Sequence, residues 1–136
     1  MSWEHFEHTA DLGLRVRAPT LEALFEDAAA GLFSMIADPG AAALGDPVDL
    51  RVEGTRHDWL LRDWLDELLY VFESRRLLLS GFTVAFDATG LTGQARGRSF
   101  DPTRQRTLHE VKAITYHALR LERTGEEWIA EVIVDI

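Results

Sequence analysis

Residues 57–75 read HDWLLRDWLDELLYVFESR, and this stretch decides much of the fold. Its apolar side chains recur at helical spacing, at Leu61, Trp64, Leu65, Leu68 and Phe72. The other side of the same helix carries acidic residues. One apolar stripe of this kind is typical of a helix that lies on a sheet. The stretch therefore predicts an amphipathic helix whose partner layer is formed by other parts of the chain.

The flanking patterns supply a second helix and several strands. Thr20 has the side chain of an N-cap, and apolar residues then recur at helical spacing until DPG at 38–40 stops the helix. Alternating apolar residues predict strands in 2–8, 12–18 and 48–54, a hairpin over 82–97, and a second hairpin formed by 109–122 and 127–136. We therefore expect residues 1–136 to form a single α+β domain, with two helices packed on a mixed or antiparallel β-sheet.

The composition excludes several classes of function. The 136 residues contain no cysteine and carry a net charge of −9. Without cysteine there is no disulfide framework, no thiolate nucleophile and no cysteine-ligated zinc. An acidic chain is poorly suited to bind phosphates and better suited to a cation or a basic protein partner. No secretory signal and no membrane-length apolar run are present, so we expect a cytoplasmic protein with no membrane contact.

Lys112, within EVKAITYH at 110–117, is the only lysine in the chain. A hairpin turn centred on 124–125 sets a register that places Ile114 opposite Asp135. Lys112 then shares a face with Asp135 and lies beside the terminal carboxylate of Ile136. This pattern leaves two interpretations open, a plain structural ion pair or a functional lysine.

A candidate cation site uses the same end of the chain. His8 and Asp11, in HTAD at 8–11, stand at the end of a predicted strand. The oxygen ligands of Asp11, Asp135 and the Ile136 carboxylate suit Ca²⁺, Mg²⁺ or Mn²⁺, if the two segments meet. The alternative is that His8 and Asp11 form a turn or capping device.

Five blocks of sequence together resemble one family. They are HTADLGLRV, TLEALFEDAAAGLF, WLLRDWLDELLYVFE, EVKAITYHAL and WIAEVIVDI, in that order from residue 8 to residue 136. The order and spacing of these blocks resemble archease over essentially the whole chain. Five blocks in order are far more specific than any one of them.

The resemblance implies a fold and a function. Archeases are small cytoplasmic α+β proteins that activate the RNA-splicing ligase, which joins 3′-phosphate or 2′,3′-cyclic-phosphate ends to 5′-hydroxyl ends. They promote guanylylation of the ligase's active-site histidine and allow multiple turnover in tRNA splicing and RNA repair. A member of this family is thus expected to be an activator, not an enzyme. Its partner is the ligase, which uses the GTP and contacts the RNA.

The resemblance also implies site residues. Asp11 and Asp135 match the family's metal-binding aspartates, with the carboxylate of Ile136 nearby, and the implied cofactor is a divalent metal (Ca, Mg or Mn). Lys112 matches the family's lysine. Its role would be to hold the carboxylate cluster ready while a cation is absent, with His8 and Glu110 as further residues needed for activation.

Two positions depart from the family pattern. Arg98 stands where a glutamate often follows the glycine, and Gln105 stands where a histidine often precedes the lysine-bearing segment. If those family residues contribute to the site, this chain has a thinner ligand set, or Glu110 and His109 compensate.

Two other functions compete with the activator. A metal-dependent hydrolase would use His8, Asp11 and Asp135, although no P-loop, no G-x-S-x-G motif and no serine with an evident neighbouring base is present. A chaperone-like binding module would need an exposed apolar patch. The metal, the ligase-contacting surface and the oligomeric state stay open at this level.

Overall fold

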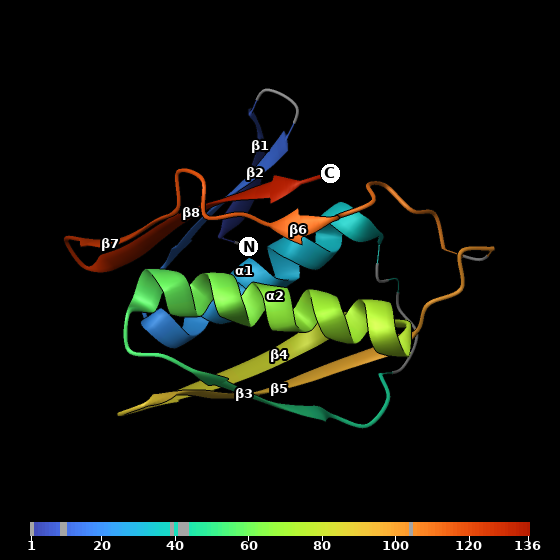
Figure 1. The fold of residues 1–136 in the computed structure, drawn as a ribbon, viewed down its shortest axis with the longest axis horizontal. Coiled ribbons are helices and arrows are strands. Elements are labelled where there is room, and N and C mark those ends of the chain that lie inside the picture. The colour runs from blue at the N-terminus through green and yellow to red at the C-terminus, as the bar shows by residue number, and fades with distance from the viewer. Residues whose placement is uncertain (1, 9–10, 39, 41–43, 104) are drawn as a thin grey trace.

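The structure, a computed structural model, describes residues 2–8, 11–38, 40, 44–103 and 105–136 (Figure 1). In chain order the elements are β1 (Trp3–His8), β2 (Asp11–Ala18), α1 (Leu21–Ile36), β3 (Val48–Glu53), α2 (His57–Arg75), β4 (Leu77–Asp87), β5 (Gly90–Ser99), β6 (Ala113–Ile114), β7 (Arg120–Thr124) and β8 (Glu127–Asp135). Neither described helix is long and apolar enough to cross a lipid bilayer.

Both predicted helices are confirmed. Helix α1 begins after Thr20, whose side-chain oxygen accepts a hydrogen bond from the Ala23 backbone N–H at 3.1 Å. Helix α2 ends at Arg75 and is followed by Arg76, which adopts a left-handed conformation with φ of 53°. Position 39 of the predicted stop signal after α1 lies outside the described residues.

The strands form two antiparallel sheets, and the two helices pack between them (Figure 1). The large sheet has the order β1-β2-β8-β6, with β7 also paired to β8, and the small sheet has the order β3-β5-β4. The predicted α+β fold, with two helices on antiparallel strands, is confirmed. The pairing of β2 with β8 joins the two ends of the chain, because Leu12 lies opposite Val134.

One buried aromatic ties the helices to the small sheet. Trp64 of α2 is fully buried, and its indole N–H donates to the carbonyl of Phe25 in α1 at 3.1 Å. Its ring lies on Gly93 of β5, where an added Cβ would come within 2.6 Å of the ring. Any larger residue at position 93 would therefore push α2 away from the sheet.

The predicted pairing of β6 with the last strand is wrong by one residue. Ala113, not Ile114, is paired with Asp135. The turn is centred on 125–126 and not on 124–125, because Gly125 supplies the positive φ of 66° that the first turn position requires. The predicted strand 109–122 is also interrupted. The chain leaves the β-ladder between β6 and β7, where Ala118 has φ of 50°.

Candidate functional site

Asp11 and Asp135 come together at one end of the large sheet. The β2–β8 ladder ends with Leu12 opposite Val134, and the same register continued by one residue would place Asp11 opposite Asp135. Because Val134 is buried against the helices and side chains alternate along a strand, the two aspartates lie on the outer face of the sheet. Both are partly exposed. Like charges that face each other directly across two strands destabilise a sheet unless a cation separates them.

The chemistry of this pair suits a hard cation. Among the described residues, neither carboxylate has a hydrogen-bond or ion-pair partner for its side chain. Carboxylate oxygens are the ligands that Ca²⁺, Mg²⁺ and Mn²⁺ prefer. No group of three or more histidine, aspartate or glutamate side chains is assembled for a metal within the described part of the chain. A cation here would therefore depend on Asp11, Asp135 and the carboxylate of Ile136, and these donors fit it.

Lys112 lies beside Asp135 through its backbone. The Lys112 N–H donates to the carbonyl of Asp135 at 2.8 Å, although Ala113 is the residue paired with Asp135. Two successive residues thus face one, as in a β-bulge. The Lys112 side chain is exposed, and its ammonium forms no ion pair with any residue that the structure describes. The plain ion pair with Asp135 is therefore not formed.

Glu110 and Lys112 line a cavity of about 550 Å³. Phe72 of α2, Arg76 and His109 also line it. The Arg76 guanidinium lies 5.8 Å from the centre of the Phe72 ring. The cavity therefore extends from the lysine-bearing segment to the C-terminal end of α2.

His8 is the residue of β1 that pairs with Asp11. Positions 9–10, between them, lie outside the described residues, and so does the His8 side chain. The expected turn or site role of His8 therefore stays a prediction.

Comparisons with known proteins decide the family. The model of the "Archease protein family (MTH1598/TM1083)" matches residues 3–136. The chain belongs to the archease family. The protein named "Protein archease" from Pyrococcus furiosus is 39% identical over 139 residues, covering 98% of each chain. Its namesake from Methanopyrus kandleri is 40% identical over 140 residues, covering all of both chains.

A solved structure agrees with this family assignment. The solution structure of Methanobacterium thermoautotrophicum protein 1598 matches with a TM-score of 0.89 at 32% identity, and the match covers 99% of each chain. The resemblance to archease and the archease fold are thus confirmed.

The two departures from the archease pattern lie away from the paired aspartates. Arg98 belongs to β5 in the small sheet, where it pairs with Leu78. Gln105 lies in the segment after β5, and its side-chain oxygen accepts from the Asp101 N–H at 2.7 Å. Neither residue belongs to the strands that bring the aspartates together.

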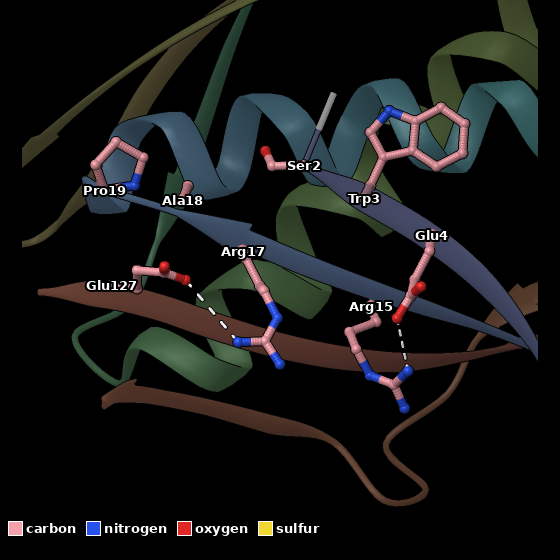
Figure 2. A pocket seen from close by; sticks show the side chains of 8 residues that line it. All are labelled: Ser2, Trp3, Glu4, Arg15, Arg17, Ala18, Pro19 and Glu127. Atoms are coloured by element: carbon pink, nitrogen blue, oxygen red, sulfur yellow. Dashed lines mark hydrogen bonds and ion pairs between the residues drawn. The ribbon is translucent and has the colours of Figure 1, made fainter. Parts of the chain in front are cut away.

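The outer face of the large sheet carries a second polar cluster (Figure 2). Arg15 donates to Glu4 at 2.7 Å and to Glu131 at 3.3 Å, and Arg17 lies 3.9 Å from Glu127. The hydrogen bond to Glu4 raises the pKa of Arg15 above its usual value. Because these charges neutralise one another, this hollow of about 460 Å³ is best explained as a solvated sheet face.

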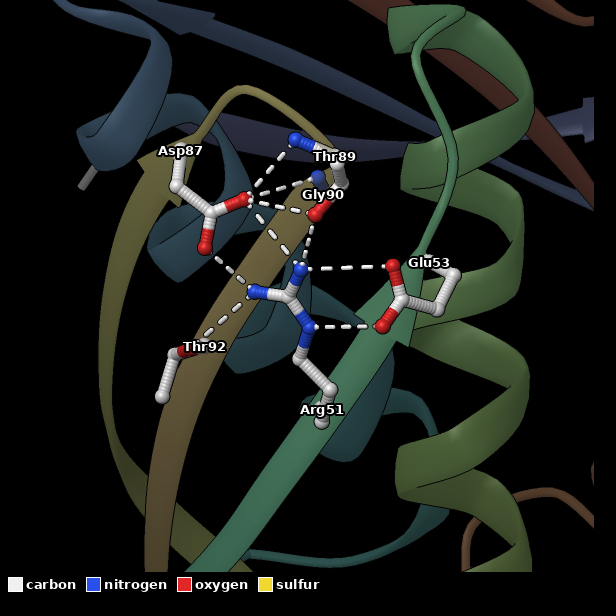
Figure 3. Close-up of polar contacts among 6 residues, drawn as sticks. All are labelled: Arg51, Glu53, Asp87, Thr89, Gly90 and Thr92. Carbon is white, nitrogen blue, oxygen red and sulfur yellow. Dashed lines mark hydrogen bonds and ion pairs between the residues drawn. The ribbon is translucent and has the colours of Figure 1, made fainter.

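A third polar cluster holds the β4–β5 turn (Figure 3). Arg51 of β3 donates to Asp87 and to Glu53, and Asp87 also accepts from the backbone N–H groups of Thr89 and Gly90. These bonds, first of all that from Arg51, hold the pKa of Asp87 well below its usual range. These hydrogen bonds fix the β4–β5 turn against β3, so we interpret the cluster as structural.

Sequence reasoning missed one close pair. Ser34 was expected to lack a neighbouring base, but its hydroxyl lies 3.1 Å from Nε2 of His5. The hydroxyl donates to the Gly31 carbonyl at 2.7 Å, which Nε2 of His5 also contacts at 3.1 Å. Among the described residues no carboxylate orients His5. The pair therefore joins β1 to α1 and does not make a catalytic dyad.

Proposed function

We propose that this archease is an accessory protein that activates the RNA ligase joining 3′-phosphate or 2′,3′-cyclic-phosphate ends to 5′-hydroxyl ends. It would promote guanylylation of the ligase's active-site histidine and multiple turnover, in tRNA splicing and RNA repair in the cytoplasm. One observation carries the proposal. Strands β2, β8 and β6 bring Asp11, Asp135 and Lys112 to the same end of the large sheet, although these residues lie at opposite ends of the chain.

Asp11, Asp135 and the carboxylate of Ile136 would hold one divalent cation, Ca²⁺, Mg²⁺ or Mn²⁺. Such a cation supplies positive charge that can neutralise a phosphate during guanylyl transfer. The two aspartates would bind it because they stand at adjoining strand ends with no described cationic partner. The seven residue pairs between β2 and β8 hold these two strand ends beside each other.

Lys112 would act on the same carboxylates from the neighbouring strand. Its amide is bound to the Asp135 carbonyl, and its ammonium is free of described ion pairs. An ammonium that reaches the two aspartates would lower their mutual repulsion while no cation is bound. Glu110, which shares a cavity with Lys112, and His8, which pairs with Asp11, would support this group.

Guanylylation of the purified ligase with GTP and Mn²⁺ tests the proposal. The chain is added at substoichiometric amounts, as wild type and as Asp11→Ala and Lys112→Ala. Asp49→Ala is the matched control, since Asp49 is an exposed aspartate on β3 of the other sheet. We expect stimulation by the wild type and the control, and its loss in the two site variants. Full stimulation by Asp11→Ala and Lys112→Ala would reject the proposal.

Two further assays separate the competing functions. A metal-dependent hydrolase would cleave RNA or a phosphoester without any ligase, and its turnover would disappear in Asp135→Ala. A chaperone-like module would suppress aggregation of an unrelated protein equally well with Asp135→Ala. Either result, with no stimulation of the ligase, would replace the activator.

A further inference from the structure

Two exposed aromatic side chains lie together near the candidate site. Trp59, in the first turn of α2, is 51% exposed, and Tyr116, in the connection between β6 and β7, is 56% exposed. Their rings are edge to face, with centroids 6.3 Å apart. Aromatic rings of this size are usually covered, so a contiguous exposed pair marks a surface with a partner.

Two arginines hold this pair in place. The guanidinium of Arg56 lies 4.4 Å from the centre of the Trp59 ring, and that of Arg62 lies 4.6 Å from the Tyr116 ring. We define these four residues as the Trp59–Tyr116 patch. Arg62 is itself fixed, because its Nε donates to the Ile114 carbonyl at 3.1 Å. A patch that is already ordered loses little side-chain entropy when it binds.

The backbone that presents Tyr116 is also fixed. Thr115 donates its hydroxyl to the Ile133 carbonyl at 2.9 Å and accepts from the His117 N–H at 3.2 Å. Ala118 then adopts φ of 50°, a left-handed conformation that is unfavourable for alanine by about 1–2 kcal/mol. Strained residues of this kind persist where the surrounding structure holds them, and they concentrate at functional segments.

The patch includes the segment that follows the candidate carboxylate site. Tyr116 comes three residues after Ala113, which pairs with Asp135, so at most roughly 10 Å of extended chain joins them. The charge at the patch is acidic on balance, because Asp58, Asp63 and Asp66 outnumber Arg56 and Arg62. Asp63 and Asp66 lie 3.3 Å and 3.5 Å from Arg62 and remain 41% and 48% exposed. A partner that covers this surface therefore needs basic groups.

We propose that the Trp59–Tyr116 patch is the surface on which a basic face of the partner ligase docks, which brings the paired aspartates to the ligase's active site. This proposal rests on the proposed function. Tryptophan, tyrosine and arginine are the residues that most often form the energetic centre of a protein interface. RNA is disfavoured as the occupant, because the neighbouring aspartates repel phosphates.

Titration of the purified ligase with Trp59→Ala, Tyr116→Ala and wild type tests the docking surface. Binding is followed by calorimetry, and guanylylation is measured over the same range of concentrations. Tyr70→Ala is the matched control, since Tyr70 is a tyrosine of the same helix that is 64% exposed. Circular dichroism and thermal unfolding check that each variant folds.

We expect Trp59→Ala and Tyr116→Ala each to raise Kd about 30-fold, the effect of removing one interface hot spot. At saturating concentration both should restore the wild-type maximum of guanylylation, whereas Asp135→Ala should lower that maximum at any concentration. Tyr70→Ala should change Kd less than about twofold.

Three results would overturn the proposal. If the wild type stimulates the ligase but both patch variants bind within twofold of it, the patch is not the docking surface and the proposed function stands. If the variants instead lose affinity for a single-stranded RNA oligonucleotide, the patch binds RNA. A wild type that neither binds nor stimulates the ligase overturns the proposed function and the docking surface together.

Discussion

The facing aspartates predict that one substitution has opposite effects with and without metal. Asp135→Asn keeps the shape of the side chain and removes one of two negative charges that the register brings together. Like charges directly opposite on two strands destabilise a sheet by up to about 1 kcal/mol. For a chain of 136 residues, 1 kcal/mol corresponds to about 3 °C in Tm. Without divalent metal we therefore expect Asp135→Asn to melt about 1–3 °C above wild type.

With metal the order should reverse. A ligand present at 100 times its Kd stabilises the folded state by about 2.7 kcal/mol, which raises Tm by about 8 °C. Wild type should show this shift with Ca²⁺, Mg²⁺ or Mn²⁺, while Asp135→Asn, with a ligand removed, should show little of it. Asp49→Asn, on the other sheet, should behave as wild type.

Thermal unfolding followed by circular dichroism measures both effects. The protein is treated with EDTA, dialysed into low-salt buffer and melted with and without each metal, because salt screens the repulsion between the aspartates. A lower Tm for metal-free Asp135→Asn than for metal-free wild type would refute the argument from charge repulsion. A wild-type Tm unchanged by all three metals would refute the cation site.

Three further predictions concern the fold. Gly13→Ala should lower the free energy of unfolding by about 1–3 kcal/mol, because the added Cβ would lie 2.3 Å from the Phe6 ring. In a Phe6→Ala background the same substitution should lower it by less than about 0.5 kcal/mol, as measured by chemical denaturation. The stabilising contribution of Asp87, whose pKa the bond from Arg51 lowers, should be complete above about pH 5 and fall as pH drops towards 2. Acid titration should therefore show wild type and Asp87→Asn converging in stability, and a constant difference would contradict this. Trp64→Phe should lower the free energy of unfolding by about 2 kcal/mol, because it removes a buried hydrogen bond to α1 and leaves a cavity. Urea denaturation measures this change.

Periodicity was sufficient for the helices and most strands. The apolar stripe of 57–75 matches the buried side of α2, and Thr20 caps α1 as its side chain suggests. Both signals are local, because helix periodicity and capping involve residues a few positions apart. The division of the strands into two sheets was not predictable in this way, since alternation shows which side chains are buried and not which strands pair.

The errors in the C-terminal hairpin have a physical cause. A two-residue turn with Thr124 in its first position would need positive φ at a β-branched residue, and the chain instead moves the turn onto Gly125. The residues between β6 and β7 then shift the register again. Ala118 is left-handed there, and alanine gives no sequence signal for that conformation. The shifted turn alone would place Tyr116 opposite Asp135, and the interruption between β6 and β7 moves the pairing back to Ala113.

The candidate site depended on information from different sources. The residue types grouped Asp11 and Asp135 as possible cation ligands only if their two segments meet, and the resemblance to archease supported that grouping. The structure brings them together because β2 pairs with β8. The Trp59–Tyr116 patch was missed, although Trp59 and Tyr116 stand outside the expected apolar positions, and large aromatics off the apolar stripe were the available signal.

Multiple-turnover ligation shows whether this chain activates the ligase through its paired strand ends. Purified ligase is incubated with GTP, divalent metal and an excess of RNA with 3′-phosphate and 5′-hydroxyl ends, and the ligated product per ligase is counted. With a small amount of this chain we predict many turnovers, and with Asp135→Ala no more than with ligase alone. Equal product with the wild type, with Asp135→Ala and without the chain would contradict the account.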